Sequence, residues 1–207
     1  MILTALLLAT QVAAQDPRLE RLDPETRSAV AAVVDSAHGV GLPVEPIIQR
    51  ALEGTTKGAA GPRIVAAVRG LAADLGTARS ALGTSASTPE LEAAVAALRA
   101  GATPQILAHL SDIRRPPLTM ALSVLADLVA SGVPADSAAA AVLALAPKAR
   151  DADLVEFRRA VERDIALGAP PGTATSIRVN AGAAPGYTTS SDPNTAEHSS
   201  SLRPRRP

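Results

Sequence analysis

The stretch GPRIVAAVRGLAADLGTARSAL, residues 61–82, decides the fold class. Its apolar residues recur in steps of four and three, which places them on one face of an α-helix. They are Ile64, Val68, Leu71, Leu75, Ala78 and Leu82. Pro62 suits a first helical turn, where its missing N–H costs nothing, and Gly83 suits a C-terminal stop. The stretch therefore predicts a long amphipathic helix that buries its apolar face against other helices.

The composition indicates a helical core built from small side chains. The chain has 207 residues, which is typical of one ordered domain with extra segments at its ends. Hydrophobic residues make up 47% of it, much of this alanine, whereas aromatic residues make up 1%. A core of alanine, valine, leucine and isoleucine gains its stability from close approach of helices rather than from large rings.

Charge and cysteine content exclude several classes of function. The 20 basic and 20 acidic residues give a net charge of zero, which argues against a polyanion-binding surface. The scarcity of aromatic residues removes the stacking platforms that bind single-stranded nucleic acid, so no nucleic-acid partner is expected. The absence of cysteine excludes disulfides, thiolate chemistry and lipid attachment at a cysteine.

The first residues are typical of a secretory signal peptide. A short apolar run covers residues 2–9, and the small residues at 12–14 suit cleavage after Ala14. The run is too short to span a bilayer, so no integral span is expected after cleavage. No lysine or arginine precedes the run, which departs from the usual pattern. The alternative is a cytosolic protein with an apolar first helix.

The middle of the chain predicts about eight helices in one domain, residues 23–168, preceded by a linker at residues 15–22. The expected helices begin near Asp23, Pro43, Pro62, Ser87, Pro104, Pro116, Asp136 and Asp153. Ser87 and Glu90 have the spacing of a capping box, and Asp153 with Glu156 is expected to cap the last helix. Residues 54–61, which are rich in glycine and threonine, are expected to form a loop.

One sequence device recurs between the expected helices. A glycine that can end a helix is followed by a small or apolar residue and then by a proline that can begin the next helix. It occurs at Gly41, Gly101, Gly132 and Gly168. The chain also divides into three short–long helix pairs, with short members from Pro43, Pro104 and Pro134 and long members from Pro62, Pro116 and Asp153. Stacked αα-hairpins of this kind form an irregular solenoid or a compact bundle, unless alanine-rich helices align by chance.

Residues 169–207 are rich in proline, glycine, serine and threonine and lack an apolar period. Such a composition buries too little apolar surface to offset the entropy of ordering, so the segment is expected to be a disordered tail. It ends in the basic sequence RPRRP, residues 203–207. That end is a solvated tail or an electrostatic tether to an anionic surface.

The histidines suggest only weak candidates for chemistry. Asp35 and His38 lie one helical turn apart, a spacing that can serve a metal, but two ligands do not make a site. His109, Ser111 and Asp112 supply the residue types of a nucleophilic triad within one short segment. A triad requires members that converge from separate elements, so the polar end of a helix is the simpler interpretation. The third histidine, His198, falls in the expected tail.

The carboxylates offer two further groups. Asp74, Asp127 and Asp164 occupy similar places in the three long helices, and Glu20, Asp23 and Glu25 cluster before them. Paired carboxylates can do acid–base work, although the neighbouring arginines favour ordinary ion pairs on a helix face. No glycine-rich phosphate loop occurs, and no catalytic, cofactor-binding or metal-binding residue is predicted.

These features favour an exported, non-catalytic helical module, periplasmic or secreted, that binds a protein or envelope partner. Two alternatives stay open. One is a hydrolase or other enzyme whose carboxylates or histidines meet only in three dimensions. The other is a membrane-surface protein held by an uncleaved N-terminal helix and the basic tail. Val124 and Leu128 lie beside the main apolar face of their helix, where they serve either a second buried face or a partner.

Overall fold

The computed structural model describes residues 16–183. Within this range the chain is all-helical, with nine α-helices, one 3-10 helix and no strand. The elements are η1 (Pro17–Arg21), α1 (Pro24–Gly39), α2 (Glu45–Thr56), α3 (Gly61–Leu82), α4 (Thr88–Ala100), α5 (Pro104–Ile113), α6 (Thr119–Ala130), α7 (Ala135–Leu145), α8 (Asp151–Ala166) and α9 (Pro171–Ala183). The expected signal peptide, residues 1–14, and residues 184–207 of the expected tail lie outside the described residues.

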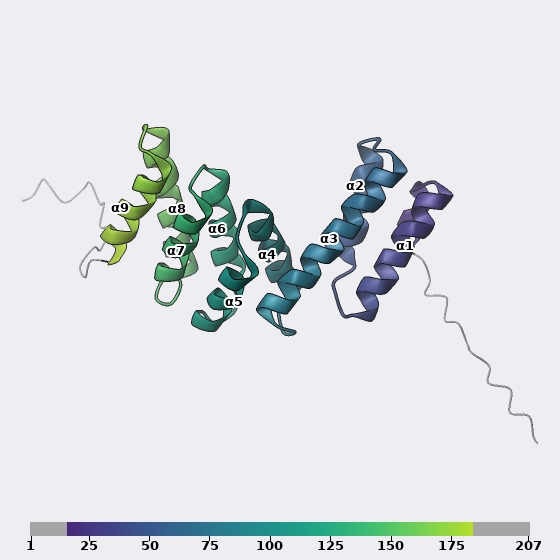
Figure 1. Cartoon of the computed structure of the whole chain (residues 1–207), viewed down its shortest axis with the longest axis horizontal. Helices are drawn as coiled ribbons and strands as arrows, with labels where there is room; N and C mark the ends of the chain where they lie inside the picture. The colour runs from purple at the N-terminus through teal and green to yellow at the C-terminus, as the bar shows by residue number, and fades with distance from the viewer. Residues whose placement is uncertain (1–15, 184–207) are drawn as a thin grey trace, which may run out of the picture.

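The helices stack side by side in an elongated array that runs from α1 to α9 (Figure 1). One row is formed by α4, α6 and α8, which pack on one another in that order, with α4 also packed on α3. The other row is formed by α3, α5, α7 and α9, again packed in sequence. α3 also packs on α1 and α2 and so joins the N-terminal helices to both rows. The predicted stack of helices is therefore confirmed, as an extended array.

Of the three expected helix pairs, the first is confirmed, because α2 packs on α3, and the other two differ from those expected. The sequence pairs the helix from Pro104 with the helix from Pro116, and the helix from Pro134 with the helix from Asp153. In the structure the extensive contacts join α6 to α7 and α8 to α9. The glycine–proline device at Gly132 and Gly168 therefore lies inside these two packed pairs, between a helix of one row and a helix of the other.

The predicted helix stops at the four glycines are confirmed. Each has a positive φ, from 73° at Gly41 to 116° at Gly101. The amide of the following residue donates to a carbonyl five residues earlier, at 2.9–3.1 Å, as in a Schellman motif. Behind Gly101 and Gly132 the following residues are Ala102 and Val133, which are buried. Each stop thus turns the chain and adds an apolar contact to the core.

The core consists of the predicted apolar faces. Five of the six predicted residues of α3 are buried, and the sixth, Leu82, is half-buried at the helix end. α6 is buried on two sides because it packs on α4, α7 and α8. Val124 and Leu128 are 1% and 0% exposed, so of the two alternatives open for them the second buried face is the correct one.

Two boundaries expected near the N-terminus are wrong. The expected linker, residues 15–22, contains η1, whose Leu19 is buried, and Leu22 is buried immediately after it. The expected loop, residues 54–61, contains the last turn of α2 up to Thr56. Gly54 lies in that turn, where a Cβ would sit 2.8 Å from Ile64 Cγ1 of α3. The glycine permits close helix packing and does not mark a loop.

Two expectations near the C-terminus are also corrected. α8 begins at Asp151, so Asp153 is not the N-cap but a third-position residue whose Oδ2 accepts from the Arg150 amide at 2.8 Å. The expected tail, residues 169–207, contains α9. α9 packs on α7 and α8 through small side chains, of which Ala174 and Thr175 are 1% and 2% exposed. The described domain therefore extends to Ala183.

Candidate functional site

The three triad-type residues remain on a single short helix. His109, Ser111 and Asp112 all lie in α5, with His109 and Asp112 exposed and Ser111 half-buried. Adjacent positions on a helix diverge around its axis, so residues 109 and 111 cannot face one another. Among the described residues no hydrogen bond joins these side chains. The structure does not bring them together as a nucleophilic site.

Asp35 and His38 lie on the last turns of α1, and both are exposed. No group of three or more histidine, aspartate and glutamate side chains that could hold a metal occurs within residues 16–183. His198 lies outside the described residues.

The three aspartates of the long helices each bind an arginine of the next packed helix. Asp74 Oδ2 of α3 accepts from Arg99 Nε of α4 at 2.8 Å. Asp127 Oδ2 of α6 lies 3.3 Å from Arg158 Nη1 of α8. The third, Asp164 of α8, forms two hydrogen bonds of 2.7 Å with Arg178 of α9. These carboxylates join neighbouring helices, and the Arg178 hydrogen bonds hold the pKa of Asp164 below its usual range.

The N-terminal acidic group serves the start of α1. Asp23 is its N-cap, and Asp23 Oδ1 accepts from the Thr26 amide at 3.0 Å. This backbone hydrogen bond lowers the pKa of Asp23. Glu20 and Glu25 are exposed beside it. Gly61, at the start of α3, lies against the same turn, where a Cβ would overlap Thr26 Oγ1.

A buried carboxylate that the sequence revealed only in part is Glu90, which is 4% exposed. The predicted capping box is present, because the Ser87 amide and hydroxyl donate to Glu90 Oε2 at 2.8 and 2.7 Å. The other oxygen, Oε1, accepts from the Leu118 amide at 2.8 Å. Burial alone would raise the pKa of Glu90, but these hydrogen bonds outweigh it and hold the pKa below its usual value. Glu90 thus ties the start of α4 to the start of α6.

Arg114 performs a similar structural role that no sequence signal indicated. It follows α5, and its Nη1 donates to the carbonyl oxygens of Ala146 and Ala149 at 2.8 and 2.7 Å. Its Nη2 binds Asp151 at the start of α8. The guanidinium, only 12% exposed, therefore holds the α7–α8 junction against the end of α5. In the sequence, Arg114 belongs to the segment RRPP, residues 114–117, whose prolines predict only a break between two helices.

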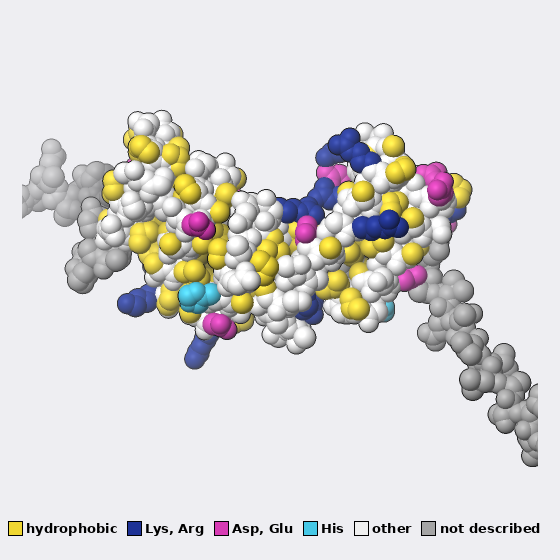
Figure 2. Space-filling model, viewed as in Figure 1, with side chains coloured by type: hydrophobic (Ala, Val, Ile, Leu, Met, Phe, Trp, Pro, Cys, Tyr) yellow, Lys and Arg dark blue, Asp and Glu magenta, His cyan; other side chains and the backbone are white. Residues whose placement is uncertain are grey.

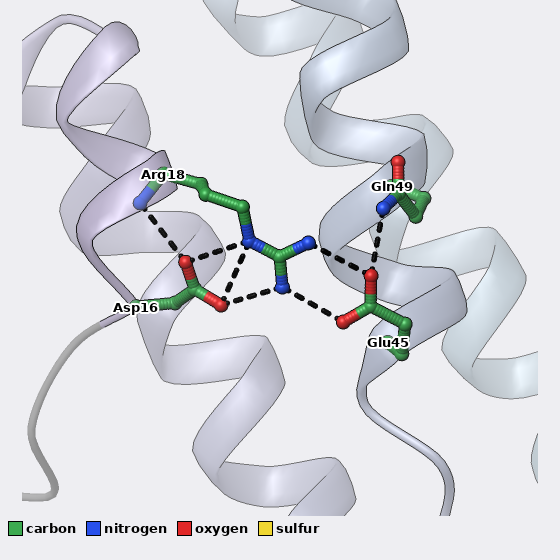
Figure 3. Close-up of polar contacts among 4 residues, drawn as sticks. All are labelled: Asp16, Arg18, Glu45 and Gln49. Carbon is green, nitrogen blue, oxygen red and sulfur yellow. Dashed lines mark hydrogen bonds and ion pairs between the residues drawn. The ribbon is translucent and has the colours of Figure 1, made fainter.

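A polar cluster fastens η1 to α2 (Figure 3). Arg18 donates to both oxygens of Asp16 and to both oxygens of Glu45, with Nη2 contacts of 2.7 Å to each carboxylate. Gln49 Nε2 donates to Glu45 Oε1 at 2.7 Å. The hydrogen bonds from Arg18 and then from Gln49 lower the pKa of Glu45 to about 2. The cluster is exposed, and every acceptor in it has a donor within the chain, so it is structural.

The remaining candidate is an open face along α1, α3 and α5, which we call the α3 face. It contains a groove of about 420 Å³ between α1 and α3 and another of about 610 Å³ between α3 and α5. Their walls are mostly alanine, glycine, serine and threonine, together with Val33, Val40 and Arg69. In Figure 2 much of the surface over α3 and α5 is yellow, for apolar side chains, or white, for uncharged polar side chains and backbone, with a few charged side chains among them. Such a surface can contact another protein but carries no convergent polar group.

None of the helices within residues 16–183 is long and apolar enough to cross a bilayer. Comparison with models of protein families, with curated proteins and with solved structures finds no match to this chain.

Proposed function

We propose that this chain is an exported helical module of the cell envelope that binds another macromolecule and does not catalyse a reaction. The observation that carries the proposal is the elongated stack of helices, in which each helix contacts only near neighbours. Stacks of this kind have a large surface for their volume and are suited to binding extended partners.

The use of the polar side chains supports binding rather than catalysis. The carboxylates that the sequence offers for acid–base work on the long helices, Asp74, Asp127 and Asp164, are each paired with an arginine of a neighbouring helix. These carboxylates hold packed helices together, and the Arg178 hydrogen bonds keep the pKa of Asp164 below its usual range, which suits an ion pair rather than a general acid.

The apolar run at residues 2–9 and the small residues before Gln15 support export. The first described element begins at Pro17, and its Asp16 cap belongs to the cluster with Arg18 and Glu45. Cleavage after Ala14 would therefore leave all the described structure intact.

Processing can be tested by mass spectrometry of the protein recovered from fractionated cells. Export with cleavage predicts an N-terminus at Gln15 in the envelope or medium fraction. An Ala14→Asp variant should retain the leader, because the residue before the cleavage point must be small. A chain that starts at Met1 and stays in the cytosol would contradict the proposal.

Binding can be tested with a photo-crosslinking residue placed at single exposed positions in intact cells. Suitable positions are Glu92 of α4, Arg159 of α8, Ala73 of α3 and Gln105 of α5. A partner surface predicts a defined heteromeric adduct from positions on one row and none from the other. Adducts that are absent at all positions, under several growth conditions, would contradict a binding role.

A further inference from the structure

One helix, α3, links two groups of helices. The first group contains η1, α1 and α2, and the second contains α4 to α9. The extensive contacts of the first group are made within the group and with α3, whereas α3 also packs on α4 and α5 of the second group. Figure 1 shows α3 crossing from one group to the other. The position of one group relative to the other therefore depends on the shape of this helix.

The first half of α3 is held by α1 and α2. Its start lies against the start of α1, where a Cβ at Gly61 would overlap Thr26 Oγ1. One turn later it lies against the end of α2, where a Cβ at Gly54 would sit 2.8 Å from Ile64 Cγ1. α1 stays beside α3 as far as Ala72, which lines a groove together with residues of α1. This half therefore belongs to the first group.

The second half of α3 is held by α4 and α5. Asp74 Oδ2 accepts from Nε of Arg99, in the last turn of α4, at 2.8 Å, and α4 follows the end of α3 after a short connection. Ala73 is the first residue of α3 in the groove that it shares with Pro104 of α5. The neighbours of α3 therefore change near Ala72 and Ala73, about the middle of its 22 residues.

Two glycines flank this change of neighbours. A Cβ placed at Gly70 or Gly76 would meet nothing within 4 Å, so packing inside the molecule does not require glycine at either position, unlike Gly54 and Gly61. Glycine in the interior of a helix weakens the helix relative to alanine. Hinges form where a few residues, often small ones, can absorb a change in backbone angles. Residues 70–76 thus combine a weakened helix with the boundary between two packed groups.

The buried side of this segment limits how it can bend. Leu71 and Leu75 are buried, whereas Gly70 and Ala73 are exposed. The backbone is therefore freest to lengthen or shorten on the open side, since nothing packs above Gly70 there. A bend of this kind changes the orientation of the two groups while the leucines keep their places in the core.

We propose that α3 bends between Gly70 and Gly76 and that this joint lets the two groups of helices change their relative orientation. Residues 61–72 form about 18 Å of helix, so a bend of about 20° would move the start of α3 by about 6 Å. Such a movement changes the curvature of the array, which sets the shape of the surface that it offers to an extended partner. The joint goes beyond the proposed function, since it requires neither export nor a partner.

The joint can be tested by measuring distances between spin labels with double electron–electron resonance. The chain has no cysteine, so each label can be placed on an introduced one. Ser28→Cys on α1 with Arg159→Cys on α8 measures distances across the joint, and Glu92→Cys on α4 with Arg159→Cys measures distances within the second group. All three positions are exposed. We expect a broader distance distribution across the joint than within the group.

Replacing the glycines tests whether this breadth arises at the joint. Gly70→Ala combined with Gly76→Ala should narrow the distribution across the joint to about the width of the distribution within the group, because alanine strengthens the helix. Gly39→Ala, at the end of α1, is the matched control, since a Cβ there also meets nothing within 4 Å. It should change neither distribution. Circular dichroism of each variant checks that the helices are intact.

Adding a glycine should have the opposite effect, but only inside the joint. Ala73→Gly should broaden the distribution across the joint. Ala66→Gly, an equally exposed substitution two turns earlier, weakens the same helix where α1 and α2 hold it and should leave the distances unchanged.

Three results would overturn the proposal. They are a distribution across the joint as narrow as the one within the group, a breadth that survives the two alanines, and equal broadening by Ala66→Gly and Ala73→Gly. A rigid α3 would leave the proposed export and partner binding unaffected.

Discussion

At the scale of single residues, Glu90 shows how one side chain links distant segments. The sequence predicts its bond to Ser87, three residues away, because the capping box is local. It does not predict the bond from the Leu118 amide, which lies 28 residues further along the chain. That bond satisfies a backbone donor at the start of α6, which would otherwise be buried without a partner.

We expect Glu90→Ala to lower the free energy of unfolding by about 2–3 kcal/mol, because it leaves the buried Leu118 amide and the part-buried Ser87 amide without an acceptor. Glu92→Ala is the matched control, since Glu92 is an exposed glutamate of the same helix, and it should change stability by less than about 0.5 kcal/mol. Urea unfolding measures both. Equal losses in the two variants would contradict the role assigned to Glu90.

The lowered pKa of Glu90 predicts a pH dependence. Because the folded-state pKa lies below the ordinary value of 4.5, ionised Glu90 stabilises the fold fully above that value. The contribution is lost as the pH falls through the lower, folded-state pKa. The stability difference between the parent chain and Glu90→Gln should therefore be constant near neutral pH and shrink below about pH 4. A difference that grows in acid would contradict this assignment.

At the scale of elements, the sequence predicts helices well where a broad apolar face is continuous. The faces of α3 and α6 are visible because leucine, isoleucine and valine recur at helical spacing. The sequence does not predict α9, because its buried residues, Ala174 and Thr175, are small residues of types that also occur in loops. Its start was nevertheless marked by the same device that precedes α7, a glycine stop followed by proline at Gly168. The site-level roles of Arg114 and Glu90 depend on contacts between helices, which spacing along the chain does not encode.

The ordered state of α9 can be tested with a matched pair of substitutions. Ala174 is 1% exposed between α7 and α8, whereas Ser176 is exposed. Ala174→Glu should lower the unfolding free energy by about 2–4 kcal/mol because it buries an unpaired charge, and Ser176→Glu should change it little. Thermal unfolding by circular dichroism gives the comparison. Identical unfolding curves for the two variants would contradict the packing of α9 and would favour a disordered tail over residues 171–183.

The two kinds of helical glycine predict opposite responses to alanine. Gly70→Ala should stabilise α3 by up to about 1 kcal/mol, because its Cβ points into open space. Gly54→Ala should destabilise by about 1–3 kcal/mol, because its Cβ would press on Ile64 and force α2 from α3. Unfolding in urea at low protein concentration compares the two. A gain in stability at Gly54 would contradict the close packing of α2 on α3.

At the scale of the whole molecule, the stack makes stability local. α8 contacts α6 and α9, whereas α1 contacts η1, α2 and α3, and the two ends are joined only through the helices between them. Energetic coupling in such arrays is largely between neighbours. Figure 1 shows the same separation, with α1 and α9 at opposite ends of the molecule.

Cavities at opposite ends should therefore weaken opposite halves. Leu154 of α8 and Ile47 of α2 are both completely buried, so replacing either with alanine should cost about 2–5 kcal/mol. Hydrogen exchange should accelerate most in α6, α8 and α9 for Leu154→Ala, and in α1, α2 and the start of α3 for Ile47→Ala. Because α3 packs on α1 and α2 but reaches α6 and α8 only through α4 and α5, its middle turns should respond more to Ile47→Ala than to Leu154→Ala. Equal acceleration of exchange along the whole chain in both variants would contradict this prediction, because the fold would then unfold as one cooperative unit. Binding of a partner at one end would in that case also change the stability of the other end.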